Sequence, residues 1–259
     1  MKVWSRREVL VAGAAAAVVA ACGGDDGGPA DAPGTTPSTA APSASTTIAT
    51  TGTTAPTATG AALTAADFDG LGSCALTPEQ TAGPFPLDEQ FERRDITEGY
   101  PGHPLHLGLR VVDADCAPVA GAAVEVWHTD ATGDYSAFTD GGGGKDEAEG
   151  TTFLRGTQTA GDDGIVEFTT IYPGWYRGRA VHIHVRVHRA GAVALTSQVY
   201  FDEAYTEEVF ATGEYAEFGP PDTTWAADGI AGDPLADGTA LALTAEGEGT
   251  RGLLNLGVR

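Results

Sequence analysis

Two histidines that can bind one metal ion occur in the segment Ala180–His188. Apolar residues alternate with polar ones along this segment, a pattern typical of a β-strand with one buried face. Because alternate side chains share a face, His182 and His184 emerge on the same side, with Cα atoms about 6 to 7 Å apart. His188 lies about 13 Å beyond His184 and is expected at the surface. The spacing therefore predicts that His182 and His184 reach one metal.

Two tyrosines can complete this ligand set. Tyr176 ends the run Pro173-Gly174-Trp175-Tyr176 before the histidines, and Tyr135 ends Gly133-Asp134-Tyr135 further upstream. Two phenolates and two imidazoles suit a hard, oxidised metal such as Fe(III), because hard anionic oxygens stabilise that state. A His-x-His strand can also hold zinc or copper, so the residues alone leave that alternative open.

The elements that must position these residues are mostly short strands separated by Gly, Asp and Pro turns. The expected strands are Leu105–Val112, Ala122–Trp127, Thr152–Thr157, Ile165–Ile171, Ala180–His188, Thr196–Phe201, Leu241–Leu243 and Leu253–Val258. Helical periodicity is weak, and one short helix is expected around Asp202–Phe210. The pattern predicts an all-β fold, an antiparallel β-sandwich with long loops and little helix.

The first 22 residues have the pattern of an export signal. A twin-arginine pair, Arg6 and Arg7, precedes an apolar run that is too short to cross a bilayer comfortably. The run ends at Ala20-Ala21-Cys22, which resembles a bacterial lipobox and predicts a lipidated Cys22 in contact with the cell membrane. An ordinary cleaved signal, lost together with Cys22, is the alternative.

The rest of the chain divides into a linker and one domain. Residues 23–66 consist mainly of Ala, Thr, Ser, Pro and Gly, which cannot bury a core, so they are predicted to be a disordered linker. Residues 67–259 have the length of a single globular domain, which is the candidate for any catalytic activity. Two cysteines, Cys74 and Cys116, lie within it, and an exported protein favours a disulfide between them. The sequence alone leaves that bond open, because it does not show their separation.

The charge of the chain restricts its partners. The formal net charge is −22, and residues 1–21 contribute three of the basic side chains. Nucleic-acid binding requires a basic surface that neutralises phosphates, so nucleic acid is not expected as a partner. The charge says nothing about the oligomeric state, which stays open.

The motifs, taken in order, resemble the intradiol ring-cleavage dioxygenases, the family of catechol, hydroxyquinol and protocatechuate 3,4-dioxygenases. The resemblance covers most of residues 77–202. It runs through Thr81-Ala82-Gly83-Pro84-Phe85, Asp95-Ile96 to Gly102, Leu107–Val112, Val119–Trp127, Gly133-Asp134-Tyr135, Thr152–Gly156, Gly164–Tyr176, His182-Ile183-His184 and Gln198-Val199-Tyr200-Phe201. Several separated motifs in the same order are more specific than any one of them.

The resemblance implies a non-haem centre with one Fe(III) per chain. Tyr135 matches the tyrosine ligand that stays bound, and Tyr176 matches the one that leaves the iron when substrate arrives. His182 and His184 match the two histidine ligands.

The resemblance also implies the reaction. Arg179 and Gln198 match the pair that flanks the bound ring, and Tyr176 takes part in catalysis by accepting a substrate proton. The implied reaction is cleavage of a catechol-type diol by O₂ to a cis,cis-muconate-type diacid. The expected export signal predicts that it takes place outside the cytoplasm. A non-catalytic sandwich domain anchored to the cell envelope is the alternative function.

Other polar residues are given structural interpretations. Arg155 is expected to support the site, and His128 to line the pocket without binding metal. Tyr172 is expected to pack, and His103 and His106 to be structural. Pro86 stands where many members of the family have a tyrosine beside the substrate pocket, which leaves the accepted ring substituent open.

Overall fold

The structure is a computed structural model in which the described residues form one packed domain. They are 61–72, 74–138 and 150–259. The expected export signal, Cys22 and residues 23–60 of the expected linker lie outside the described residues. Residues 61–66, also expected in the linker, are described, and Leu63 is buried against Phe68, Ile165 and Leu253.

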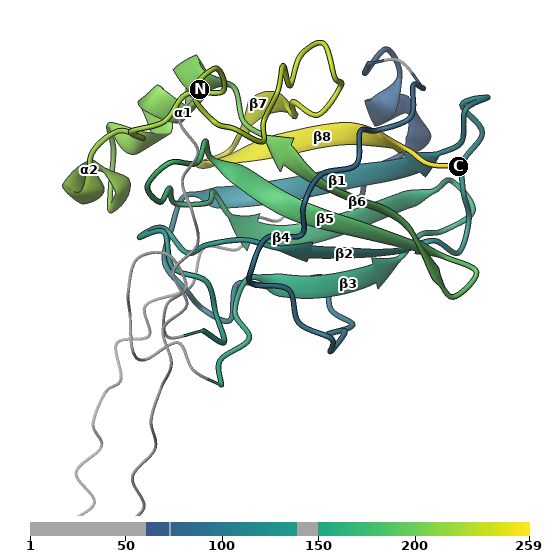
Figure 1. The fold of residues 1–259 in the computed structure, drawn as a ribbon, viewed down its shortest axis with the longest axis horizontal. Coiled ribbons are helices and arrows are strands. Elements are labelled where there is room, and N and C mark those ends of the chain that lie inside the picture. Colours follow the sequence, from purple (N-terminus) through teal and green to yellow (C-terminus); the bar gives the residue numbers. More distant parts are fainter. Residues whose placement is uncertain (1–60, 73, 139–149) are drawn as a thin grey trace, which may run out of the picture. The chain divides into compact units, whose positions relative to one another are not determined.

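The domain is a β-sandwich of two four-stranded sheets (Figure 1). The strands are β1 (Pro104–Val112), β2 (Ala123–Trp127), β3 (Arg155–Thr159), β4 (Ile165–Ile171), β5 (His182–Arg189), β6 (Ala192–Tyr200), β7 (Ala242–Glu246) and β8 (Gly249–Gly257). One sheet has the order β4-β1-β8-β7 and the other β3-β2-β5-β6. All pairings are antiparallel except that between β1 and β8, which is parallel. The predicted antiparallel β-sandwich with little helix is confirmed.

Each of the eight expected strands is present, most of them with shifted ends. The strand β4 has the bounds expected from its apolar run. The strand β3 begins three residues later than the expected Thr152, because Leu154 adopts a left-handed φ of 56° that an extended strand does not allow.

Helices are few in the described residues. They are η1 (Ala65–Phe68), α1 (Glu203–Phe210) and α2 (Tyr215–Phe218). The helix α1 begins where the sequence predicts, because the side chain of Asp202 accepts a hydrogen bond from the Tyr205 amide and caps it. In this part of the chain no helix has the length and apolar character that crossing a membrane requires.

The apolar core lies between the two sheets. In β5 the buried core side chains are Ile183, Val185 and Val187, and they pack with alternate apolar side chains of β1. The histidines of β5 therefore lie on the opposite, outer face of their sheet, as the alternation predicts.

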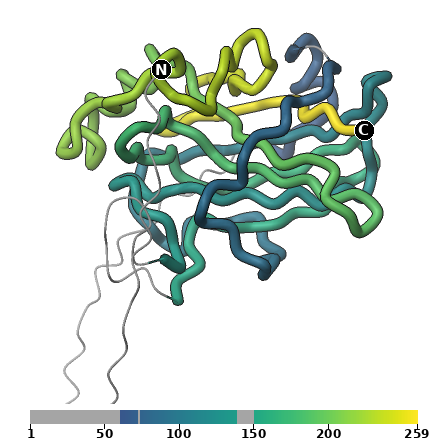
Figure 2. The backbone as a smooth tube through the Cα atoms, viewed as in Figure 1, coloured from purple at the N-terminus to yellow at the C-terminus, as the bar shows by residue number. Residues whose placement is uncertain are grey.

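Segments outside the strands cover that outer face. The segment 77–95 crosses from β8 to β4, with backbone contacts to Gly257, Thr196, Thr157 and Thr169 on the way (Figure 2). Cys74, just before it, forms a disulfide with Cys116, with Cα atoms 5.2 Å apart and a sequence separation of 42. Closing a loop of this length stabilises the fold by about 4 kcal/mol in the chain-entropy view.

Candidate metal centre

A row of four residues runs across the outer face of the β3-β2-β5-β6 sheet. Arg155 on β3 is paired with Trp127 on β2, Trp127 with His184 on β5, and His184 with Gln198 on β6. Directly paired residues share a face, so the strand register alone brings these four side chains together. The rings of Trp127 and His184 are stacked, with centroids 4.9 Å apart and planes 2° apart.

Four donor atoms converge beside this row. The Tyr135 Oη lies 3.3 Å from His182 Nε2 and 3.1 Å from His184 Nε2, and the two Nε2 atoms are 3.3 Å apart. The Tyr176 Oη lies 3.4 Å from His182 Nε2. The structure thus brings together all four residues that the sequence suggested as metal ligands.

The separations fit a single metal ion. Donors that bind one ion at about 2.0–2.2 Å lie roughly 3.0–3.4 Å from one another at the usual coordination angles. The protons also fit, because His182 Nδ1 lies 2.6 Å from the Ala180 carbonyl oxygen and donates its proton there. The Nε2 of the neutral ring therefore carries a lone pair. This lone pair points into the cluster, where it can bind a cation.

Burial sets the protonation of the cluster. Desolvation, with a contribution from the charge of Arg179, lowers the pKa of His182 to about 3. Desolvation likewise lowers the pKa of His184 well below its usual range, so both rings stay neutral at physiological pH. Burial and the neighbouring Tyr176 raise the pKa of Tyr135 well above 10. Without a cation the site therefore disfavours the tyrosinate, and a bound metal would reverse this preference.

The two tyrosines come from loops that touch through glycines. A Cβ on Gly174 would lie 2.4 Å from the Asp130 carbonyl oxygen and 2.6 Å from the Gly133 nitrogen. A Cβ on Gly133 would lie 2.2 Å from the Trp175 carbonyl oxygen. The two loops can approach this closely only because these positions lack side chains.

The two tyrosines differ in their freedom to move. Tyr135 is fully buried and its ring stacks on Phe85, with centroids 4.8 Å apart. Tyr176 is half-buried and lies next to the exposed Arg177 and Gly178. The geometry therefore allows Tyr176, but not Tyr135, to swing away from the cluster.

Arg155 supports the Tyr135 side of the cluster. Its guanidinium is buried and donates to the Ser136 hydroxyl at 2.8 Å, the Ser136 carbonyl at 2.9 Å and the Phe85 carbonyl at 2.8 Å. These bonds join the segment that carries the stacking ring of Phe85 to the residue after Tyr135.

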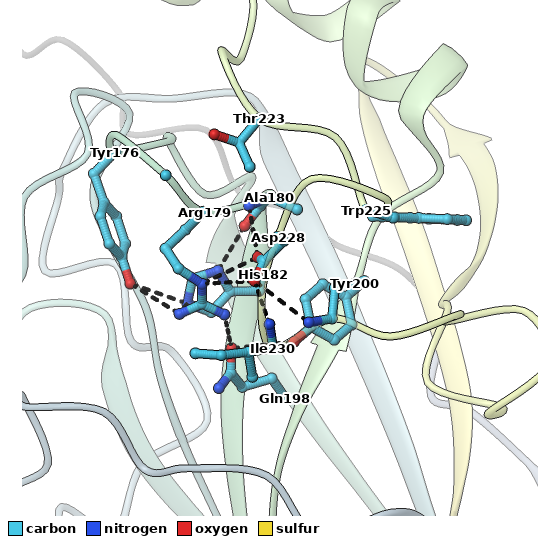
Figure 3. Close-up of polar contacts among 12 residues, drawn as sticks. Tyr176, Arg179, Ala180, His182, Gln198, Tyr200, Thr223, Trp225, Asp228 and Ile230 are labelled. Carbon is cyan, nitrogen blue, oxygen red and sulfur yellow. Dashed lines mark hydrogen bonds and ion pairs between the residues drawn. The ribbon is translucent and has the colours of Figure 1, made fainter. Parts of the chain in front are cut away.

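The guanidinium of Arg179 lies beside the cluster, between Tyr176 and Gln198 (Figure 3). Its Nη1 donates to the Tyr176 hydroxyl at 3.3 Å, and its Nη2 donates to the Gln198 Oε1. The Gln198 Nε2 donates to the Thr81 carbonyl at 3.0 Å, which fixes the orientation of the amide. The site thus combines four convergent donor atoms with one guanidinium and one oriented amide.

Other histidines singled out in the sequence have partners outside the cluster. His128 is buried and bonded to the Thr129 carbonyl and the Thr170 hydroxyl at 2.8 and 2.7 Å, and its nitrogens do not join the cluster of donor atoms. Its two nitrogens are both satisfied inside the domain. Among the described ranges no group of three or more His, Cys, Asp or Glu residues is placed to hold a metal.

The remaining polar residues take structural positions. Tyr172 is buried and bonds to the Thr206 hydroxyl at 2.8 Å, and His103 Nε2 lies 2.8 Å from the Thr250 hydroxyl. His188, expected at the surface, is half-buried, with its ring 3.7 Å from a Glu125 oxygen.

Sequence reasoning missed one residue beside the site, Asp228. Its carboxylate lies 3.0 and 3.2 Å from the Nε of Arg179. The residue occurs in an irregular segment with no motif and no periodicity, so the sequence carries no signal for it.

The comparisons agree with this geometry. A family model described as Dioxygenase matches residues 78–212. A solved structure of an intradiol ring-cleavage dioxygenase from Tetranychus urticae shares 33% identity and a TM-score of 0.65, over 72% of this chain and 95% of that chain.

Two further relatives are more distant. The dioxygenase domain of a dioxygenase and carbohydrate-binding protein fusion from Streptomyces sp. SirexAA-E shares 25% identity and a TM-score of 0.52, over 71% of this chain and 97% of that domain. Catechol 1,2-dioxygenase 1 of Acinetobacter lwoffii is 29% identical over 66% of this chain and 58% of its own length. The chain spans about half the length of the catechol and chlorocatechol 1,2-dioxygenases that it matches.

Proposed function

We propose that this chain, which belongs to the intradiol ring-cleavage dioxygenase family, cleaves a catechol-type diol with O₂. The cut falls between the two hydroxylated carbons and yields a cis,cis-muconate-type diacid. The observation that carries the proposal is the convergence of Tyr135, Tyr176, His182 and His184, with donor separations of 3.1 to 3.4 Å.

The proposed cofactor is one Fe(III) per chain, held by these four residues. Two tyrosinates and two neutral imidazoles form a donor set that favours the ferric state. A bound Fe(III) supplies the Lewis acidity and the electron-accepting capacity that a catechol needs in order to react with O₂.

The protein supplies the proton acceptor, the charge and the orientation. Tyr176 is half-buried and can leave the cluster, so its phenolate oxygen takes one proton from the incoming diol. Tyr135 is fully buried and stays. Arg179 stabilises negative charge that develops on the substrate, and Gln198 hydrogen-bonds in the same pocket.

The proposed location is outside the cytoplasm, with the domain held at the membrane through a lipidated Cys22. The twin-arginine pair, the Ala20-Ala21-Cys22 sequence and the linker composition support this. The Cys74–Cys116 disulfide is also typical of proteins from oxidising compartments.

The visible spectrum of the purified protein tests the metal centre. Tyrosinate bound to Fe(III) gives a red-brown protein, whereas zinc would leave the protein colourless. Substituting Tyr135→Phe removes one phenolate, so the band should disappear or shift strongly. Tyr172→Phe is the matched control, since Tyr172 is an equally buried tyrosine whose hydroxyl bonds to Thr206 instead.

Two results would refute the assignment. A colourless protein without iron after reconstitution would exclude the centre, and an unchanged band in Tyr135→Phe would exclude this ligand. Oxygen uptake with a panel of catechols then tests the reaction, and no uptake with any of them would favour a binding module.

A further inference from the structure

Asp228 is a buried carboxylate next to the proposed site. Its side chain is 0% exposed, and its oxygens accept hydrogen bonds from the backbone amides of Ala180 at 2.9 Å, Ile230 at 2.8 Å and Ala231 at 3.3 Å. The same oxygens lie 3.0 and 3.2 Å from the Arg179 Nε. A buried carboxylate with this many donors is held in one position.

The bond to Asp228 leaves the other two nitrogens of Arg179 to face the site. Its Nη1 donates to the Tyr176 hydroxyl at 3.3 Å and its Nη2 to Gln198 (Figure 3). Because Nε is bonded to a fixed carboxylate, the plane of the guanidinium is fixed. The edge that carries Nη1 then points toward Tyr176, the ligand proposed to leave the metal. Without this bond the guanidinium can rotate about its own side chain.

The charges of this pair are also matched. Burial alone would raise the pKa of Asp228, but the amides of Ile230 and Ala180 and the charge of Arg179 outweigh it and lower the pKa. Asp228 is therefore ionised and offsets the charge of Arg179, which lies 3.5 Å from the His182 Nε2. A cation this close to a metal-binding nitrogen disfavours a bound metal unless a carboxylate compensates it.

The segment that carries Asp228 lies outside the matched family region, which ends at residue 212. Residues 219–231 contact the loop before β5 at several points. The Trp175 Nε1 donates to the Gly219 carbonyl at 3.0 Å, and the Ala180 amide donates to Asp228. A stretch of chain after the matched region thus sets the position of a residue within it.

We propose that Asp228 is the positioning residue for Arg179, an inference that rests on the proposed function. Asp228 does not touch the proposed metal ligands. It holds the guanidinium in the plane in which Arg179 contacts Tyr176 and Gln198, and it balances the charge of Arg179 beside the metal centre. Its effect on the reaction therefore passes through Arg179.

The test is a double-mutant cycle on the iron-loaded full chain with Asp228→Asn and Arg179→Ala. In the wild-type background Asp228→Asn should lower kcat about 100-fold with little change in KM, because a small misplacement of a catalytic group has this effect. In the Arg179→Ala background the same change should lower kcat less than about threefold, because residues that act through one another are not additive. An equal loss in both backgrounds would show that Asp228 only holds the loop and would overturn the proposal.

The matched control is Asp222→Asn, the same change in the same segment. Asp222 is exposed, and its Oδ1 accepts a hydrogen bond of 3.4 Å from the Gly178 amide. It does not contact Arg179. Its kcat should stay within about twofold of wild type, as is usual for surface substitutions. If Asp222→Asn lowers kcat as much as Asp228→Asn, the segment as a whole and not this carboxylate is responsible.

A second measurement does not depend on the reaction. In nitrogen-15 spectra of the metal-free protein the Arg179 Nε–H, assigned by its absence in Arg179→Ala, should exchange slowly with water. Asp228→Asn should make that exchange fast, and Asp222→Asn should not. A slow signal in Asp228→Asn overturns the proposal even if the wild-type protein cleaves no catechol.

Asp228→Glu serves where Asp228→Asn fails to fold. The variant keeps the charge but adds a methylene, which displaces the guanidinium, so kcat should fall about tenfold. A wild-type kcat in this variant would contradict a positional role.

Discussion

Each of the two sheets has a site with buried histidine side chains on its outer face. The two sites differ in the groups that contact the ring nitrogens. On β1, His106 is 1% exposed, with Nε2 2.9 Å from a Glu167 oxygen and Nδ1 3.2 Å from a Glu246 oxygen. On β5, the Nε2 atoms of His182 and His184 face each other and two phenols. Both nitrogens of His106 thus face carboxylate oxygens, whereas the Nε2 atoms of His182 and His184 face each other and phenol oxygens.

The difference separates a structural histidine from a candidate metal ligand. Buried polar groups are paired with a partner of opposite kind, and the His106 site obeys this rule with its own carboxylates. Arg94 adds a further contact to Glu167 at 2.5 Å. In the β5 cluster the described partners of the Nε2 atoms are phenol hydroxyls and the Arg179 guanidinium, with no carboxylate among them. The identity of the partners, and not burial itself, distinguishes the two sites.

The largest expected effect comes from His182→Ala. This change removes one of the converging donors, so metal affinity should fall by more than about 100-fold, beyond the range for loss of a supporting contact. Iron content and oxygen uptake measure it. Full iron content in this variant would mean that the β5 cluster is not the metal site and that the comparison with His106 fails.

A smaller effect is expected from Gly174→Ala, which leaves every donor in place. The new Cβ meets the backbone of Asp130 and Gly133, so the loops that carry Tyr135 and Tyr176 must separate. We expect kcat to fall about 100-fold, as for other small misplacements of reacting groups. Gly161→Ala is the control, because the nearest atom to its Cβ, 3.2 Å away, belongs to the side chain of Asp163. Similar kcat values in the two variants would refute the role of the loop contact.

The structural site should respond in the opposite way. His106→Leu leaves the oxygens of Glu167 and Glu246 without their ring partner and should cost about 2–3 kcal/mol of folding stability. Iron content and activity per folded molecule should stay within about twofold. Urea unfolding and iron analysis on the same samples check both expectations, and loss of iron here would remove the distinction between the two histidine sites.

The smallest expected effect concerns the pH dependence of stability in the metal-free protein. Burial lowers the pKa of His128 to about 4 from its unfolded value of 6.5. The unfolded chain then binds more protons between these values, so stability is present above pH 6.5 and is lost as pH falls toward 4. His128 should account for roughly 2 kcal/mol of loss between pH 7 and 5, measured by urea unfolding. An equal loss in His128→Gln would show that His128 does not titrate in this way.

Local patterns account for much of the fold. The alternation along β5 predicts its outer histidines and inner valines, and the apolar run of β4 predicts that strand to the residue. The parallel pairing of β1 and β8 was not predictable, because their apolar patterns suit either direction. The partners of His128 were not predictable either, because strand patterns do not show that Thr129 and Thr170 satisfy both its nitrogens.

The sequence by itself determined the candidate chemistry: a His-x-His strand, two tyrosines in separate motifs and the order that resembles intradiol dioxygenases. These are local features, carried by residue type and spacing. Only the tertiary structure decided that the four donors meet within 3.1 to 3.4 Å, that Gly133 and Gly174 allow it, and that Asp228 holds Arg179. The physical reason is that such contacts join segments far apart in the chain, and their distances depend on the packing of the two sheets and the loops that cover them.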